Sequence, residues 1–149
     1  MKRKYPTGPV LGVGGVVIWK GRILLEERKF EPSRGKWSIP GGVVELGESP
    51  EQSVIREVEE ETNLQVCNPQ LLDVVNSVTV DGKGEIEYHF VVIDYFVKLK
   101  GGILKAADDA RQVRWVDLAQ VESYNLPESF RKFFHRNKQR LVYLNSVEE

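Results

Sequence analysis

Cysteine is almost absent from this chain of 149 residues, which contains only Cys67. One thiol cannot form an intrachain disulfide, and it cannot supply the cysteine cluster of a structural zinc site. We interpret Cys67 as a small apolar filler rather than as a reactive group. A chain without a disulfide framework is typical of a reducing compartment, so we expect a cytoplasmic protein.

Long hydrophobic runs are absent as well. No apolar segment approaches the roughly 20 residues that a membrane-spanning helix needs. The basic residues 1–4 are followed by Pro6, Gly8 and Pro9 instead of an apolar stretch, so the sequence predicts no secretory signal peptide. We therefore expect no membrane partner.

Neither sign of charge is in excess, because 21 Lys and Arg residues stand against 22 Asp and Glu residues. A nearly neutral chain exerts no broad attraction on nucleic acid. The one basic segment with aromatic residues, Arg131–Arg140, is interpreted as the solvated side of an amphipathic helix and not as an RNA or DNA contact. The sequence therefore predicts no nucleic-acid partner.

Several common catalytic and nucleotide-binding motifs are also missing. The chain has no P-loop, no HExxH zinc motif and no GxSxG nucleophile elbow. The segment Gly12–Gly15 lacks the third glycine of a dinucleotide-binding loop, and no helix is expected after it. These absences argue against the enzyme classes that depend on those motifs.

What is present is an ordinary composition for a soluble domain, and a chain of this length buries one hydrophobic core. There is no internal repeat and no linker, so residues 1–149 are predicted to form a single domain. The patterning predicts strands or short extended segments at residues 11–19, 22–27, 36–44, 64–79, 85–99 and 112–116. Gly101-Gly102 is expected to break the strand that precedes it.

Two helices are predicted, the later one from Pro127 to about residue 140. Strands flanked by helices favour an α/β or α+β fold with a mixed sheet. The clearest helix spans residues 49–62, where Ser49 suits the N-cap and Gln52 completes a capping box. Asn63 stands where a residue in the left-handed conformation commonly ends a helix.

Six acidic residues gather around this helix: Glu48, Glu51, Glu57, Glu59, Glu60 and Glu61. Glu57 and Glu61 are four residues apart, so their side chains share one helix face and repel each other. A cation between them removes that penalty, and Mg²⁺ favours carboxylate and carbonyl oxygen ligands. Arg56 is four residues before Glu60 and is placed to orient the acidic cluster. The pair Gly41-Gly42 lets the backbone approach a ligand or metal, since no Cβ intrudes.

This segment resembles the Nudix box, whose pattern is Gly, five residues, Glu, seven residues, Arg-Glu, an aliphatic residue, one residue, Glu-Glu, one residue, Gly and an aliphatic residue. The chain supplies these positions in register: Gly42, Glu48, Arg56, Glu57, Val58, Glu60, Glu61 and Leu64. The single departure is Asn63, where the family has Gly, and Asn tolerates the left-handed conformation better than most residues. The similarity extends to Trp37–Pro40 ahead of the box and to Arg114–Val116 near the end.

The resemblance implies an α/β/α sandwich and an enzyme that hydrolyses a diphosphate linked to a further group. The metal site that it implies comprises Glu48, Glu57, Glu60, Glu61 and a carbonyl of Gly41 or Gly42. Glu57 and Glu61 are then the primary ligands of Mg²⁺, or of Mn²⁺ in its place, and Glu48 is an outer acid. Glu60 is a supporting ligand or the partner of Arg56. The expected catalytic residues are Glu57, Arg56 and Glu60.

The general base has alternatives. Some family members place a glutamate three residues before the late tryptophan, but here that position is Gln112, which cannot accept a proton. Asp108 or Asp109, in the loop before it, and a glutamate of the box remain. We favour Glu57.

The stretch Tyr88–Tyr95 and the residues around Trp115 are similar to the ADP-ribose pyrophosphatase-like branch of the family. That similarity implies a small-molecule nucleotide substrate, ADP-ribose or a related nucleotide sugar, and it favours a homodimer. We expect Arg28 and Arg34 to contact phosphates, and Trp37, Tyr88 or Trp115 to stack on a base.

Two other functions stay open. Nucleoside triphosphate pyrophosphohydrolases that cleanse the nucleotide pool, of the 8-oxo-dGTP type, have similar sequences. A family member can also sense a nucleotide without hydrolysing it, but such members usually lose acids of the box. This chain keeps the arginine and the glutamates of the box, so we expect catalysis.

Overall fold

The structure is a computed structural model and describes residues 2–107 and 110–148. In chain order, the described residues form the following elements: β1 (Val10–Val16), β2 (Ile18–Trp19), β3 (Arg22–Arg28), β4 (Trp37–Ser38), β5 (Gly41–Val43), α1 (Pro50–Thr62), β6 (Leu64–Val80), β7 (Ile86–Gly102), β8 (Ala110–Asp117), the 3₁₀ helix η1 (Leu118–Ser123) and α2 (Glu128–Glu148).

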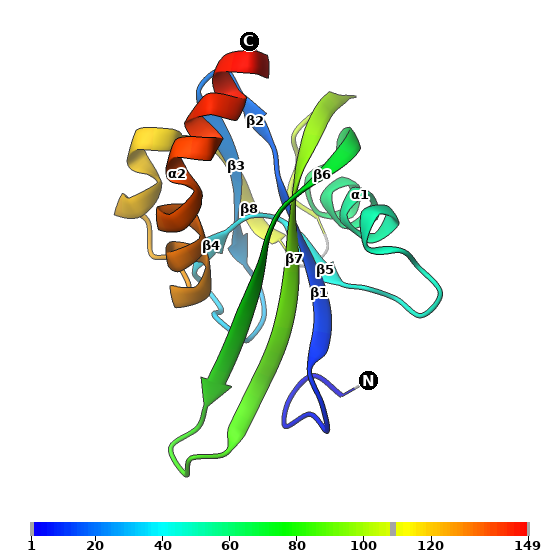
Figure 1. Ribbon diagram of the computed structural model, residues 1–149, viewed down its shortest axis with the longest axis vertical. Helices are drawn as coiled ribbons and strands as arrows, with labels where there is room; N and C mark the ends of the chain where they lie inside the picture. The colour runs from blue at the N-terminus through cyan, green and yellow to red at the C-terminus, as the bar shows by residue number, and fades with distance from the viewer. Residues whose placement is uncertain (1, 108–109, 149) are drawn as a thin grey trace.

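The strands form two sheets. The first has the order β5-β1-β7-β6, and it is mixed because β1 runs parallel to β7 whereas the other pairs are antiparallel. In the second, β3 pairs antiparallel with β2, β4 and β8. The helices α1 and α2 lie on opposite sides of the sheets, and the β6–β7 hairpin extends beyond the rest of the domain (Figure 1). The predicted α/β/α sandwich with a mixed sheet is confirmed.

The single strand expected at residues 11–19 is divided between the two sheets. β1 ends at Val16 and pairs with β7, and β2 begins at Ile18 and pairs with β3. Between them, the Val17 carbonyl accepts a hydrogen bond of 3.0 Å from Leu24 N–H. A continuous apolar run thus serves both sheets, which the alternation of residue types alone does not reveal.

Helix α1 lies close against β1. A Cβ built on Gly15 would come within 2.7 Å of a methyl carbon of Val58, so glycine is what lets the helix approach the strand at this point. Val54 and Val58 are fully buried here, and they pack in one core cluster with Tyr95 and Val97 of β7. This contact fixes where the glutamates of α1 stand relative to the first sheet.

Both ends of α1 follow the prediction. The Ser49 hydroxyl accepts a hydrogen bond of 3.1 Å from Gln52 N–H, and the Gln52 side chain accepts one of 3.0 Å from Ser49 N–H. Asn63 ends the helix with φ of 64°, and its N–H donates to the Glu59 carbonyl. Its side-chain amide also donates to the Ile103 carbonyl at 2.8 Å, a contact that glycine could not make.

In the second half of the chain, two expectations need correction and one element was missed. Gly101-Gly102 does not break β7, because Gly102 still pairs with Leu64 of β6. The 3₁₀ helix η1 was not predicted. Helix α2 continues to Glu148 instead of ending near residue 140, and the fully buried Leu141 anchors its second half.

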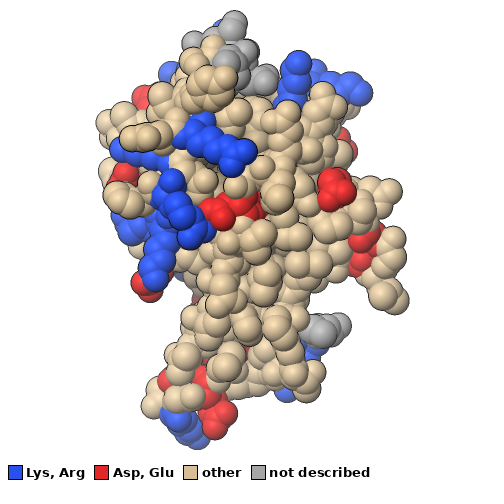
Figure 2. Space-filling model, viewed as in Figure 1, with Lys and Arg blue, Asp and Glu red and all other residues tan. Residues whose placement is uncertain are grey.

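Helix α2 is amphipathic as expected. Phe130, Phe133 and Phe134 are buried, while the basic side chains of the helix are exposed and gather over it on the face shown in Figure 2. Arg136 is held at Asp73 of β6 by a contact of 2.6 Å. Among the described residues, no helix is long and apolar enough to cross a membrane.

The left-handed end of α1 gives a first prediction. Asn63→Ala should lower the free energy of unfolding by about 1–2 kcal/mol, because alanine resists positive φ and cannot bond to the Ile103 carbonyl. Asn63→Gly is the matched control and should stay closer to the original protein, since glycine adopts this φ freely. Urea unfolding of the three proteins measures the difference. An alanine variant as stable as the original would contradict this account of the helix end.

Candidate functional site

Arg56 gathers three of the glutamates that the sequence singled out. Its Nε and Nη2 contact the two carboxylate oxygens of Glu48 at 2.7 and 3.0 Å. Its Nη1 donates to Glu57 at 2.8 Å and to Glu60 at 3.1 Å. The hydrogen bond from Arg56 lowers the pKa of Glu48 to about 2. These three carboxylates are therefore held in place by one guanidinium group.

Glu57 lies against the backbone of β5. A Cβ built on Gly42 would overlap the Glu57 carboxylate, so the absence of a side chain at Gly42 makes room for it. Burial raises the pKa of Glu57 above its ordinary value, although the hydrogen bond and charge of Arg56 act in the opposite direction. The structure thus brings Glu57, Gly42 and Arg56 together at the edge of the first sheet.

Glu61 points deeper into the protein and is 1% exposed. Its Oε2 accepts a hydrogen bond of 3.1 Å from Gly41 N–H, and its Oε1 has no hydrogen-bond partner in the described part of the chain. Burial, and then the neighbouring carboxyl group of Glu26, raise the pKa of Glu61 to about 12. Glu26 is itself 2% exposed and was missed by the sequence analysis. The feature of the sequence that could have indicated Glu26 is its position as an acid directly after the apolar residues of strand 22–28.

The donor set fits a hard divalent cation. Glu57 and Glu61 present carboxylate oxygens on one face of α1, Glu61 Oε1 is buried without a hydrogen bond, and Gly42 leaves its backbone accessible. Carboxylate and carbonyl oxygens are the ligands that such ions prefer. Within residues 2–107 and 110–148, however, no three carboxylate, imidazole or thiol groups already converge as a finished metal site. The arrangement therefore offers candidate ligands whose side chains still have to turn toward an ion.

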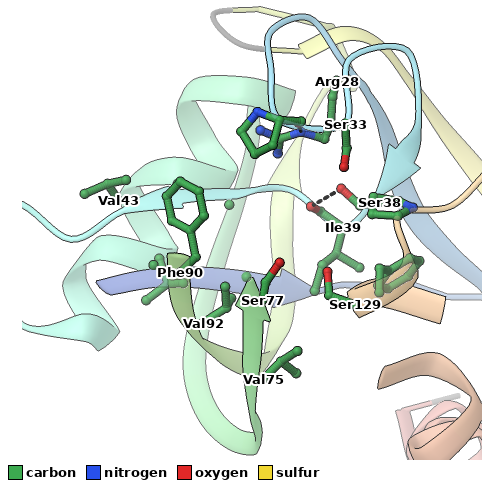
Figure 3. A pocket seen from close by; sticks show the side chains of 18 of the residues that line it. Arg28, Ser33, Ser38, Ile39, Val43, Val75, Ser77, Phe90, Val92 and Ser129 are labelled. Atoms are coloured by element: carbon green, nitrogen blue, oxygen red, sulfur yellow. Dashed lines mark hydrogen bonds between the residues drawn. The ribbon is translucent and has the colours of Figure 1, made fainter. Parts of the chain in front are cut away.

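A cavity of about 300 Å³ opens beside these acids and is lined in part by Glu26, Glu61, Gly41 and Gly42. Phe90, Val92 and Val75 rise into it from β7 and β6, and Arg28 stands at its rim (Figure 3). Four serine side chains from separate segments point toward the same space (Figure 3): Ser33, Ser38, Ser77 and Ser129. An apolar floor with a few converging polar groups is typical of a small-molecule site.

The residues expected to contact substrate are dispersed. Arg28 lines the cavity, and its Nε donates to the Pro32 carbonyl at 2.7 Å. Arg34 and Tyr88 line an adjoining hollow. Tyr88 is buried and stacks on Phe90 with ring centres 6.3 Å apart.

The two tryptophans expected to stack on a base pack elsewhere. Trp37 lines neither hollow: its ring is buried against Tyr124 and lies under the guanidinium of Arg114. It is therefore a core residue, because its ring surface is already covered by protein. Trp115 packs against Trp19 with ring centres 5.5 Å apart.

The residues considered as a general base outside the box are Gln112, Asp108 and Asp109. Gln112 is exposed and donates to the Glu27 carboxylate at 3.2 Å, and it does not line the cavity. Asp108 and Asp109 lie outside the described residues. Of the glutamates in the box, Glu61 lines the cavity, and Glu57 lies against Gly42, which also lines it.

The NUDIX domain profile matches residues 8–136, which is most of the chain. This protein belongs to the NUDIX domain family. NUDIX hydrolases generally use divalent metal ions, in keeping with the oxygen-rich donor set.

The similar proteins are named either as an ADP-ribose pyrophosphatase or as MutT-like proteins. An ADP-ribose pyrophosphatase of Methanocaldococcus jannaschii is 39% identical over 110 residues, which cover 74% of this chain and 63% of that protein. The chain thus spans less than two thirds of that relative. A MutT-like protein of Streptomyces ambofaciens is 34% identical, with 77% of this NUDIX chain and 70% of the relative covered. The crystal structure of a MutT protein from Methanosarcina mazei superposes with a TM-score of 0.75 at 28% identity, covering 91% and 97% of the two chains.

The pairing of Glu48 with Arg56 predicts a specific loss of stability in acid. The folded pKa of Glu48 lies below its ordinary value of 4.5, so its contribution is fully present above about pH 4.5 and is lost as the pH falls toward 2. Glu48→Gln should be less stable than the original protein at pH 6, and the difference should narrow at pH 3. Urea unfolding at both pH values measures this, with the exposed Glu59→Gln as control. A stability difference that is the same at both pH values would show that it does not come from the ion pair between Glu48 and Arg56.

Proposed function

We propose that this protein hydrolyses the diphosphate bond of a nucleoside diphosphate linked to another group, with ADP-ribose as the best candidate and Mg²⁺ or Mn²⁺ as cofactor. One observation carries the proposal: Glu61 lines a cavity of a size that can hold part of a nucleotide, and Glu57, which Arg56 holds, lies against Gly42 of the same lining. The similarity to an ADP-ribose pyrophosphatase at 39% identity supports the choice of substrate.

Each acidic residue has a distinct part in this proposal. Glu57 and Glu61 hold the metal ion, with Glu60, Glu26 and the backbone of Gly41 or Gly42 as further oxygen donors. A bound divalent ion lowers the pKa of a water molecule and neutralises charge on the diphosphate oxygens. Arg56 is a positioning residue, because its contacts are to Glu48, Glu57 and Glu60. Glu57 is also placed to accept the proton of the attacking water, because its carboxylate lies against Gly42 in the lining of the cavity.

The cavity provides the binding part of the reaction. Arg28 at the rim is placed to attract phosphate, and its guanidinium group suits phosphate oxygens. Phe90 and Val92 offer apolar surface to a ring, and the serine hydroxyls offer hydrogen bonds. Arg34 and Tyr88 are available to the far part of a longer substrate, because the hollow that they line adjoins the cavity.

Nucleoside triphosphates are the second candidate substrates. The MutT-like relative of Streptomyces ambofaciens is 34% identical and covers slightly more of this chain than the Methanocaldococcus protein does. Both reactions use the same carboxylates, so they differ in what the cavity accepts. A phosphate-release panel of ADP-ribose, nucleoside triphosphates including oxidised ones, and dinucleoside polyphosphates tests the proposal, each with Mg²⁺ and with chelator. Preference for ADP-ribose supports it, preference for triphosphates favours the second candidate, and binding without turnover would favour a nucleotide sensor.

Glu57 is the first residue to test. Glu57→Gln should lower turnover at least about a hundredfold, because a metal ligand and proton acceptor is replaced by a neutral amide. Glu59→Gln makes the same chemical change on the exposed side of the same helix and should leave turnover unchanged. Steady-state kinetics at saturating Mg²⁺ compare the two. Near-normal activity of Glu57→Gln would mean that the reacting face of α1 has been assigned wrongly.

Gly42 gives a prediction that separates activity from stability. A methyl group at this position would displace the Glu57 carboxylate, which is the flexible end of a side chain, and so Gly42→Ala should fold. Its turnover should fall at least about tenfold, since a misplaced catalytic group is costly to the rate. Gly82→Ala, at a position with open space for a methyl group, is the control. Full activity in Gly42→Ala, with thermal unfolding unchanged, would show that the position of Glu57 is not critical.

A further inference from the structure

Asp94 is a buried acid that the proposed chemistry does not use. It lies in the middle of β7, is 4% exposed and lines the cavity. No described residue donates a hydrogen bond to its carboxyl group. Burial, and then the charge of Asp73, raise its pKa to about 7, and Arg136 lowers it only in part. A buried polar group without a partner is costly, so its presence in the cavity floor requires an explanation.

A purely structural role does not account for Asp94. Its neighbour Asp73, paired with it across β6 and β7, shows what such a role looks like in this protein. Asp73 accepts hydrogen bonds from Arg136 and Asn137 at 2.8 Å and from Val74 N–H. The cationic group of α2 is thus bonded to Asp73, and Asp94 is left facing the cavity.

The backbone makes room for this acid. Gly14 of β1 is the register partner of Asp94, and a Cβ on Gly14 would overlap the Asp94 carboxyl oxygen. Gly14 is also the partner of Gly41 in β5. Asp94 therefore stands two strands away from Gly41, roughly 10 Å at the usual strand spacing of about 4.8 Å. A sugar followed by a base can bridge a separation of this order between the diphosphate site and Asp94.

We propose that Asp94 is a specificity-determining residue that recognises the nucleobase of the substrate by binding the amino edge of an adenine ring. The inference rests on the proposed function for the placement of the diphosphate. Phe90 and Val92, on the same face of β7, provide the apolar surface on which the ring lies. Ser77, opposite Phe90 in β6, lies on the same floor.

The choice of adenine follows from hydrogen-bonding chemistry. Burial favours the neutral form of this carboxyl group, and that form has one donor and one acceptor side by side. Adenine presents an amino donor next to a ring-nitrogen acceptor and so matches both. On the edge formed by N7 and the 6-substituent, adenine offers an acceptor and a donor, whereas hypoxanthine offers two acceptors, N7 and its carbonyl oxygen, and so leaves the carboxyl acceptor without a partner. Asparagine reproduces the donor and acceptor of the neutral acid, whereas leucine has similar size and neither.

Equilibrium binding of AMP and IMP, measured by calorimetry, tests the inference without requiring turnover. The original protein should bind AMP at least about tenfold more tightly than IMP, the scale of one unpaired buried polar group. Asp94→Leu should lose that preference, and Asp94→Asn should keep it. Asp117→Asn, a change to an exposed aspartate, is the control and should match the original protein. Equal binding of AMP and IMP by the original protein would overturn the inference even if Asp94→Leu fails to fold.

Kinetics separate this inference from the proposed function. With ADP-ribose and its hypoxanthine analogue, Asp94→Leu should raise KM for ADP-ribose at least about tenfold with kcat within about threefold, because Asp94 contacts the base and not the reacting phosphorus. A lowered kcat with unchanged KM would overturn the assignment to base recognition. If the original protein hydrolyses neither compound but prefers AMP through Asp94, the hydrolase proposal fails and the inference stands.

Discussion

The contact between Arg56 and its carboxylate partners is the interaction on which the acidic end of this domain depends. Like charges at helical spacing repel, and α1 carries several within two turns. The guanidinium group forms a two-pronged contact with Glu48 and shares its remaining nitrogen between Glu57 and Glu60. It also donates to the Val43 carbonyl at 3.3 Å. Arg56 therefore offsets the repulsion and at the same time ties the helix to β5.

That tie works because two backbones come close without side chains between them. Gly15 lets α1 pack on β1, and Gly42 leaves the space that the Glu57 carboxylate fills. Gly14, which precedes Gly15 in β1, leaves the space that the Asp94 carboxyl group fills. Glycines in β1 thus admit the helix on one face of the first sheet and the Asp94 carboxyl group on the cavity face. Strands β1 and β5 both contact α1 and line the cavity, so the acids of α1 keep a fixed position relative to the cavity.

Local signals were sufficient for helix α1 and its acidic face. The capping box at Ser49 and the left-handed Asn63 depend on residues near in sequence, and such contacts can be deduced from spacing. Pairing between distant segments could not be deduced in this way. Gly102 stays in β7 because Leu64 lies opposite, and Glu26 enters the site because β3 lies beside Glu61. The prediction that Trp37 stacks on a base missed its packing for the same reason, because Tyr124, which covers its ring, is far away in the chain.

The two sets of acids differ in charge, and this difference suits an anionic substrate. Glu48 is kept ionised by Arg56, whereas Glu61 and Asp94 have raised pKa values because burial disfavours their charged forms. A cavity lined by ionised carboxylates would repel phosphate, but neutral carboxyl groups supply hydrogen bonds without that repulsion. Glu61 becomes a good ligand only when a cation replaces its proton, so metal binding and ionisation are coupled at this position. The charge of Arg136 lowers the pKa of Asp94 only in part, because Arg136 is bonded to Asp73. In the proposed function Asp94 discriminates between bases while the carboxylates of α1 serve the diphosphate.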